Sequence, residues 1–467
     1  MSQIVAATAE QFSRQIPLIE CMYPGYRVKH WNIEQNHSVP RLFLELEPVG
    51  LPVCPRCRQP CLHIHDQKTR RVRDYSSLWG FDIFVEFPVR RVRCRCGCHR
   101  TERLSWVEPR ARLTNQMISH LQYRLRSGET HKDLAESLHL SWDTIRVYDE
   151  LMLKKVLRDP DFSRVENIAI DEFSIRKGHR YATIVIDVDV CKVLWVGMGK
   201  TINSVRPFFD LLRKAGADKR IRSVSCDMNA AYPRMVRENL PQAVITYDLF
   251  HVISNFTRDV LKEAKKAAQE KLRAEIDRME DDEEKESLSR QLRDLKGSDW
   301  LMVRRKEDLK AHRLETLDRV TKENALFAAL QPVAERLRKI WSIRSSFESR
   351  QNLLWLINYL RGVAAGHDFR PARRFAGMLR RRLPGIIHAG KFGFGTSRLE
   401  GVNNRIKVIK RKAYGIRNFR YFVLKIRETF PGKGTSLWIG YPPGIAFLKT
   451  RVWSAYEQLD TYFPTKP

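Results

Sequence analysis

The chain has 467 residues, of which 43% are hydrophobic, enough for two to four domains with apolar cores. Lys and Arg number 84 against 54 Asp and Glu, and the formal charge of +30 favours a polyanionic partner, nucleic acid above all. The sequence has no apolar run long enough to span a bilayer and no signal-peptide pattern. It therefore predicts a cytoplasmic, nucleoid-associated protein with no membrane partner.

Five of the nine cysteines fall into two tight groups within the N-terminal region, residues 1–104. The first group, VCPRCRQPC, contains Cys54 and Cys57, and the second, RRVRCRCGCHRTER, contains Cys94, Cys96 and Cys98. Intracellular thiols stay reduced, and two cysteine knuckles beside strand-like residues are typical of a zinc ribbon. Four of the five cysteines are expected to bind zinc. The second knuckle is compressed, so either Cys96 or Cys98 can complete the site, with His99 as a reserve ligand.

Residues 105–160 carry apolar positions at helical spacing, interrupted at Ser127-Gly128 and at 139–141. A helix, a short turn and a second helix with Ser141 as its N-cap predict a helix-turn-helix. The DNA-facing start of its recognition helix then contains Ser141, Trp142, Thr144 and Arg146. An ordinary three-helix packing unit is the alternative.

From residue 165 the pattern changes to strands, predicted at 168–175, 181–188 and 192–197. A helix follows at about 204–215, then a fourth strand ending on Asp227, another helix, and a fifth strand ending on Asp248. Three consecutive strands followed by alternating helix and strand is the order of a ribonuclease H-like fold. The sequence thus predicts a multidomain α/β protein in which 165–262 and 341–430 form this core.

Residues 263–340 interrupt the core with a helical insertion, in which the acidic run EDDEE at 280–284 is the expected turn of a helical hairpin. The late segment 397–427 is strongly basic, and residues 431–467 form a C-terminal tail without assignable chemistry. The DNA-contacting cations expected in the late segment are Arg405, Lys407, Lys410, Arg411 and Lys412.

Three acids that are distant in sequence are predicted to lie close together in the folded chain. Asp171 lies within the first strand of the predicted sheet, Asp227 ends the fourth, and Glu400 lies on a late helix. A carboxylate on an apolar strand must be paired, hydrogen-bonded or bound to metal, because burial of an unpaired charge is costly. The first and fourth strands of such a sheet are neighbours, and a late helix packs across their ends. Clustered carboxylates suit two Mg²⁺ or Mn²⁺ ions, which activate a water or a 3′-hydroxyl at a phosphodiester.

Several long motifs resemble those of the DDE transposases of bacterial insertion sequences, specifically the ISL-three family. These motifs are the CPRC…RRVRC module, AIDEFSIRKGHRYATIVIDVD, SCDMNAAYP, YDLFHV and LEGVNNRIKVIKRKAYGIRNFRYF. The resemblance covers about residues 50–430. It implies a catalytic triad of Asp171, Asp227 and Glu400, with Asp248 and His251 as an accessory motif. The chain departs from the family in the compressed second knuckle and in the Arg-rich stretch RRRLPGIIHAG.

The resemblance implies an enzyme that binds terminal inverted repeats, cleaves double-stranded DNA at the element ends and transfers the strands to target DNA. Cleavage at two ends predicts a homo-oligomer, a dimer or larger. Two alternatives are a ribonuclease H-like nuclease without strand transfer and a DNA-binding regulator with an inert catalytic domain. The intact triad argues against the regulator.

Overall fold

The computed structural model describes residues 16–17, 19–37, 39–75, 81–176, 180–228, 231–340, 342–392, 397–412 and 418–433. Within these ranges, the side chains at 249–250 and 390–400 lie outside the description. The chain divides into two compact units, of which one runs to Leu157 and the other spans Arg158–Ser436.

The first unit contains a sheet in which the strands lie in the order β1-β2-β4-β3, with β5 paired to β4. Its strands are β1 (Tyr26–Glu34), β2 (Arg41–Pro48), β3 (Ile64–Asp74), β4 (Asp82–Arg93) and β5 (His99–Thr101). On β2 the alternate residues Leu42, Leu44 and Leu46 are fully buried, the period expected of a strand with one covered face. Residues 1–50 carry only weak strand signals in the sequence, whereas β1 and β2 are regular members of this sheet.

Three helices follow the sheet: α2 (Asn115–Ser127), α3 (His131–Leu138) and α4 (Trp142–Val156). Gly128 ends α2 in the left-handed conformation at φ 105°, Thr130 caps α3, and Ser141 caps α4 by accepting a hydrogen bond from the backbone of Thr144. Each boundary is thus made by a residue whose chemistry satisfies free backbone groups. The predicted order of a helix, a short turn and a second helix capped by Ser141 is present.

The second unit is built on a sheet in which the strands lie in the order β8-β7-β6-β9-β10. These strands are β6 (Asn167–Arg176), β7 (Arg180–Asp187), β8 (Lys192–Met198), β9 (Ser223–Cys226) and β10 (Val244–Tyr247). The first three form an antiparallel meander, and β9 and β10 run parallel to β6. This is the predicted ribonuclease H-like order. The link at 177–179, between the first two predicted strands, lies outside the described residues.

Helices cover both faces of this sheet, and alternate residues of β6 face different layers. Ile168 and Ile170 belong to an apolar cluster with α5 (Ile202–Lys214) and α6 (Ala231–Asn239). Ala169 and Phe173 belong to the opposite cluster, with α15 (Ser397–Lys412) and α16 (Phe419–Thr429). Asp171 shares the parity of Ala169 and Phe173, so it faces the layer that contains α15.

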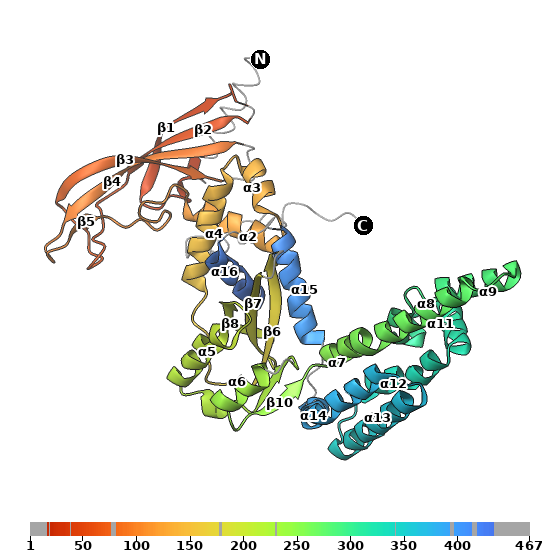
Figure 1. Ribbon diagram of the computed structural model, residues 1–467. Helices are drawn as coiled ribbons and strands as arrows, with labels where there is room; N and C mark the ends of the chain where they lie inside the picture. The colour runs from red at the N-terminus through yellow and green to blue at the C-terminus, as the bar shows by residue number, and fades with distance from the viewer. Residues whose placement is uncertain are drawn as a thin grey trace, which may run out of the picture. The chain divides into compact units, whose positions relative to one another are not determined.

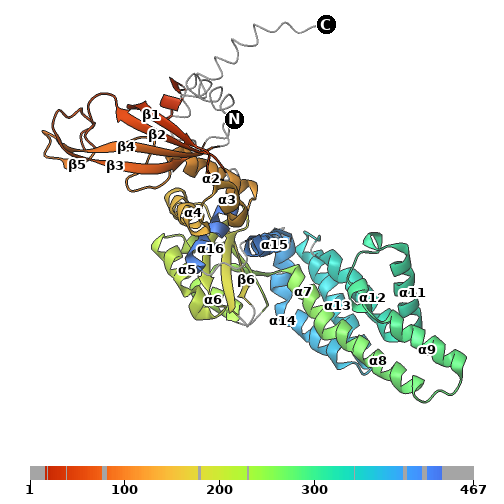
Figure 2. The ribbon, with the colours of Figure 1, turned by 90° about the horizontal axis from the view of Figure 1, so that it is seen from above.

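A helical layer extends from the β10 edge of the sheet, as both views show (Figures 1 and 2). It comprises α7 (Leu249–Phe256), a π-helical turn (Thr257–Leu261), α8 (Lys262–Ile276), α9 (Asp282–Asp294), α10 (Ser298–Met302), α11 (Ala311–Glu323), α12 (Ala325–Ile340), α13 (Ser346–Gly366) and α14 (Arg370–Phe392). One apolar cluster runs through these helices and includes Leu353, Leu360 and Phe375, so the layer continues past residue 340. The run at 280–284 lies at the N-terminus of α9, where Asp281 is the N-cap and acids are favoured.

The helix α14 packs against β10 so closely that one position admits no side chain. A Cβ atom added to Gly385 would lie 2.5 Å from Tyr247 Cε2 and 3.1 Å from the backbone oxygen of Ile245. Gly377 of the same helix has no such neighbour, since the nearest atom is Nη1 of the Arg381 side chain at 3.4 Å. Gly385 therefore sets the distance between the helical layer and the sheet.

We predict that Gly385→Ala lowers the free energy of unfolding by about 1–3 kcal/mol, because the methyl group overpacks the contact with β10. Gly377→Ala is the matched control on the same helix. It should raise stability by about 0.5–1 kcal/mol, because alanine restricts the unfolded chain and fits the helix. Chemical denaturation of both variants checks this, and equal stabilities would contradict the proposed close approach.

Candidate active site and zinc module

The sheet register brings three carboxylates to one edge of the ribonuclease H-like core. Ala169 pairs with Ser225 across β6 and β9, and Cys226 pairs with Tyr247 across β9 and β10. If the β6–β9 register is continued by two residues, Asp171 lies beside Asp227. If the β9–β10 register is continued by one residue, Asp227 lies beside Asp248. The carboxyl ends of parallel strands share one edge of a sheet, which explains why acids so distant in sequence converge.

Asp171 is held by two hydrogen bonds. Its Oδ1 accepts from its neighbour's backbone, the N–H of Glu172, at 2.8 Å, and its Oδ2 accepts from Asn403 Nδ2 of α15 at 2.6 Å. Only 13% of the Asp171 side chain is exposed. The Oδ1 atom of Asn403 is buried and has no hydrogen-bond partner among the described residues. The amide cannot turn around, because its oxygen would then face the carboxylate.

Asp227 is more open, with 37% of its side chain exposed. Its Oδ1 accepts from the backbone N–H of Met228 at 2.5 Å, and Arg382 of α14 donates to the carbonyl oxygen of the same Met228 at 2.5 Å. Asp248 is buried at the end of β10. A cation from the helical layer therefore anchors the loop that presents Asp227.

His251, on α7, lies between the two strand-borne carboxylates. Its Nδ1 is 3.4 Å from Asp227 Oδ1, and its Nε2 is 3.8 Å from Asp171 Oδ1. Burial alone would lower the pKa of His251, but its close approach to Asp171 and the charges of Asp227, Asp171 and Asp248 raise it to about 9. The imidazole thus contributes a positive charge at the point where negative charge is concentrated. The structure brings the predicted accessory histidine into the site.

Sequence reasoning missed a second carboxylate that braces the same strand from the opposite face. Glu172 Oε1 accepts a hydrogen bond from the Tyr232 hydroxyl of α6 at 2.5 Å. Burial raises the pKa of Glu172, while this hydrogen bond and Lys200 oppose the shift. The contact ties β6 to the helix that follows Asp227. The alternation of β6 could have indicated that Glu172 faces away from Asp171.

The third predicted acid, Glu400, lies in the first turns of α15, and its side chain is outside the description. Asn403, one helical turn later, contacts Asp171. Of the predicted basic residues, Arg405, Lys407, Arg411 and Lys412 are exposed. Lys410 instead donates to the Ser174 backbone oxygen of β6 at 3.0 Å. Helical spacing sets positions 400 and 403 on one face of α15, but it does not predict the contact of Asn403 with Asp171.

Four of the five candidate zinc ligands converge in the first unit. The sulphur atoms of Cys54, Cys57, Cys94 and Cys96 all lie within 4.8 Å of one another. The Cys54–Cys96 and Cys57–Cys94 separations are 3.7 and 3.5 Å. Tetrahedral coordination at about 2.3 Å per Zn–S bond spaces the sulphurs by about 3.8 Å, so the cluster fits zinc. Backbone N–H groups, that of Cys57 first, lower the pKa of Cys54 to about 6 and favour its thiolate.

The remaining candidates of the second knuckle have other surroundings. Cys98 is buried beneath the cluster, and its backbone oxygen accepts from the N–H of Cys94 at 2.9 Å. The ring of His99 packs edge-on against His65, with centroids 4.4 Å apart. The left-handed Gly97, at φ 78°, turns the chain between the two strands. The compressed spacing therefore still delivers two sulphurs to the cluster.

The start of α4 is the predicted DNA-reading surface. Trp142 is 48% exposed and Ser141 is exposed at the cap, where its hydroxyl lies 2.8 Å from that of Thr144. The Arg146 guanidinium is 3.1 Å from Glu150 and 3.5 Å from Asp143. These acids hold Arg146 along the helix, so a DNA phosphate or base must compete with them.

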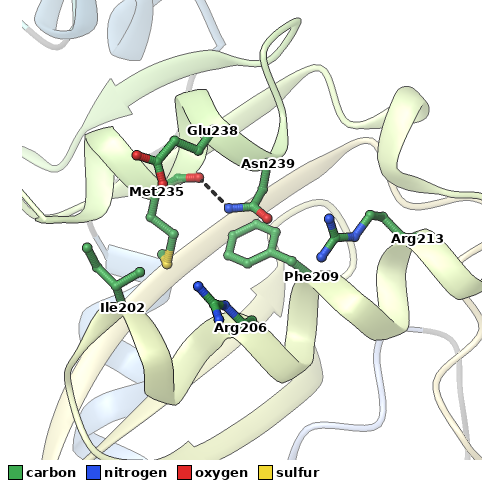
Figure 3. Close-up of a pocket in the computed structure, with 7 residues that line it drawn as sticks. All are labelled: Ile202, Arg206, Phe209, Arg213, Met235, Glu238 and Asn239. Atoms are coloured by element: carbon green, nitrogen blue, oxygen red, sulfur yellow. Dashed lines mark hydrogen bonds between the residues drawn. The ribbon is translucent and has the colours of Figure 1, made fainter.

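A shallow cavity of about 380 Å³ lies between α5 and α6, on the face of the sheet opposite Asp171 (Figure 3). It is lined by Ile202, Arg206, Phe209, Arg213, Met235, Glu238 and Asn239. Three of its polar residues have partners within their own helices: Asn239 donates to the Met235 carbonyl, Arg213 pairs with Asp210, and Glu238 pairs with Arg234. None of the predicted site residues lines it. Among the described helices, moreover, none has the length and apolar character needed to cross a membrane.

Comparison with known proteins supports this organisation. A family model described as transposase, of the ISL-three type, matches residues 168–426. A second model, described as the zinc-finger of transposase IS204/IS1001/IS1096/IS1165, matches residues 50–98. The second match spans the four clustered cysteines, so the N-terminal module is a zinc ribbon.

Curated relatives match most of the chain. The transposase for insertion sequence element IS1001 of Bordetella parapertussis is 33% identical over 414 residues, covering 88% of this chain and 96% of the relative. The transposase for element IS1557 of Mycobacterium tuberculosis is 24% identical, covering 78% and 83%. Among solved structures, the Drosophila P element transposase strand transfer complex aligns at 10% identity and a TM-score of 0.30, covering 70% of this chain and 94% of that one. The fold assignment rests on the strand order instead, and the family matches identify the chain as a transposase of the ISL-three family.

Proposed function

We propose that Asp171, Asp227 and Glu400 are the catalytic carboxylates of this transposase, and that they act with Mg²⁺ or Mn²⁺. The observation that carries the proposal is the convergence of Asp171 and Asp227 around His251, within 3.8 Å of both. Two carboxylates this close to one imidazole mark a place where positive charge is stabilised. The buried Oδ1 of Asn403, which has no hydrogen-bond partner among the described residues, adds an oxygen acceptor beside Asp171. Such an oxygen-rich set suits a hard divalent ion.

We assign Glu400 as the third acid from its position in the sequence of α15. Residues three apart on a helix share a face, so positions 400 and 403 belong to the same face of α15. Asn403 contacts Asp171, which supports Glu400 rather than Asp248 as the third acid. Asp248 and His251 then have a supporting role, in which the histidine balances the carboxylate charge.

The chain's own residues prepare the reaction by fixing the acids. Asn403 and the Glu172 backbone orient Asp171, while Arg382 and the Met228 backbone orient Asp227. Divalent ions held there supply activation of a water or 3′-hydroxyl and stabilisation of the leaving oxygen of a phosphodiester. The reaction is cleavage at the element ends and joining of 3′-hydroxyls to target DNA.

Recognition of the terminal inverted repeats is assigned to the helix-turn-helix, through Ser141, Trp142, Thr144 and Arg146. Arg405, Lys407, Arg411 and Lys412 are assigned to phosphate contacts beside the active site, and Lys410 joins them only by leaving Ser174. Because two ends must be joined in one reaction, the working form is a dimer or larger. The nuclease alternative shares the carboxylates but needs no end-reading domain.

We expect Asp171→Ala, Asp227→Ala and Glu400→Ala each to reduce cleavage and joining on the order of 10⁴-fold, the scale for members of one catalytic unit. Binding to element ends should persist. Asp248→Ala and His251→Ala should retain partial cleavage with Mn²⁺, because they support the ligands. Asp210→Ala, at an exposed acid of α5, is the control. Strand-transfer assays on labelled ends measure all six, and normal joining by Glu400→Ala would contradict the choice of third acid.

We further propose Cys54, Cys57, Cys94 and Cys96 as the zinc ligands. Cys96→Ser should then lower the zinc content of the purified chain from about one equivalent to a small fraction and unfold the module, because metal binding stabilises it directly. Cys98→Ala should keep its zinc and lose only a buried contact. Elemental analysis distinguishes them, and the reverse result would assign the site to Cys98.

Replacement of Thr144 or Arg146 by Ala should reduce the preference for inverted repeats over random DNA by about 5- to 150-fold, the range for one lost base contact. Lys155→Ala, near the far end of α4, should weaken both DNAs equally if it has any effect. Competition binding at fixed salt measures the ratio. Unchanged preference in both variants would move recognition to the zinc module or to 407–412.

A further inference from the structure

The exposed face of α14 carries a strip of arginines that neither the triad nor the helix-turn-helix uses. Arg370, Arg373, Arg374, Arg380 and Arg381 are all exposed. Among the described residues, none of these five guanidinium groups forms an ion pair. The helix contains no Asp or Glu, and between Glu348 and Glu400 the chain has ten Lys or Arg and one acid, Asp368. We call these five residues the arginine strip.

A solvated helix face in this same protein has a different composition. From Lys262 to Asp294, the hairpin of α8 and α9 has nine Lys or Arg and eleven Asp or Glu. Lys266 lies 3.9 Å from Glu270 and Lys271 lies 3.8 Å from Glu275, as expected of exposed pairs four residues apart. The arginine strip lacks such compensation. Its self-repulsion is unfavourable unless a polyanion covers it.

A glycine lies in the middle of the strip. Gly377 falls on the same face as Arg370, Arg374 and Arg381, and helix-interior glycine is unfavourable relative to alanine. Packing within the protein does not require it, because an added Cβ would meet only the flexible end of Arg381 at 3.4 Å. A glycine at such a position allows a partner to approach the helix backbone closely.

The strip is fixed relative to the active site. The same helix contacts β10 at Gly385, and its Arg382 donates to the Met228 backbone oxygen next to Asp227. The spacing from Arg370 to Arg381 is eleven residues, or about 16 Å of helix. At about 3.4 Å per nucleotide along one strand, this length matches about five phosphates.

We propose that the arginine strip of α14 docks duplex DNA through its phosphates, independently of sequence, and guides it to the carboxylates. The proposal rests on the proposed function, because it extends the DNA path of that active site onto the helical layer. The duplex is either target DNA or the DNA that flanks the element, which present the same phosphates. Arginine suits this contact because its planar guanidinium binds phosphate oxygens in pairs.

The test compares two full-length variants with equal loss of charge. The strip variant replaces Arg373, Arg374, Arg380 and Arg381 by Ala, and the control replaces Lys266, Lys271, Arg273 and Arg278 of the α8 region by Ala. Binding to a random duplex is measured across salt concentrations. Each lost phosphate contact should lower the slope of log K against log salt by about 0.9, so the strip variant should lose about 2–4 in slope. The control should keep the wild-type slope.

Equal slopes of log K against log salt for the strip variant, the control and the wild type would overturn the proposal. The partner of the arginine strip would then be an acidic protein and not DNA. Two further assays identify the duplex. If the strip variant still cleaves element ends but no longer joins them, the strip binds target DNA. If it loses both activities, the strip binds the DNA that flanks the element. Random-duplex binding needs no catalysis, so a wild-type chain unable to cleave ends would refute the proposed chemistry without affecting this measurement.

Discussion

The repulsion between carboxylates at one edge of the central sheet is the constraint on which the rest of the second unit depends. The register aligns Asp171, Asp227 and Asp248 on three adjacent strands, where their charges oppose the folded state. Every nearby element supplies a compensating group. The helix α15 contributes Asn403, the helix α7 contributes His251, and the helix α14 contributes Arg382. These groups oppose the repulsion at the negatively charged edge of the sheet.

This compensation explains why the helices of the second unit lie where they do. The helix α15 packs Val402 and Ile406 into the core and thereby presents Asn403 to Asp171. On the other face, the Tyr232 hydroxyl donates a hydrogen bond to Glu172. This bond links the strand of Asp171 to α6, the helix that follows Asp227. The contact of Gly385 with Tyr247 sets α14 at the edge of the sheet. The packing of these helices against the sheet therefore also determines where the neighbouring carboxylates lie.

The strand order, the helix-turn-helix and the acids at the strand ends could be predicted from the sequence. The spacing of apolar residues and the helix-capping residues that indicate them are local signals. Residues 26–48 carry only weak strand signals because their alternation is carried by only one face of a polar sequence. The contacts of Asn403 and Tyr232 could not be predicted from spacing alone, since they join residues 232 and 60 positions apart. The place of His251 between two acids likewise depends on the register, which no local pattern encodes. The choice between Cys96 and Cys98 depended on how Gly97 turns the chain.

The two kinds of charge in this protein are separated in space, and the separation has a physical reason. Acids concentrated at the sheet edge attract divalent ions but repel phosphates, so the DNA must be held from surfaces outside that edge. In our proposal, those surfaces are the exposed cations of α15 and the arginine strip of α14, both on helices that contact the loops or strands of the acids. A net charge of +30 spread evenly would bind DNA anywhere. Cations on helices that are anchored beside the carboxylates would instead direct the scissile phosphate to them.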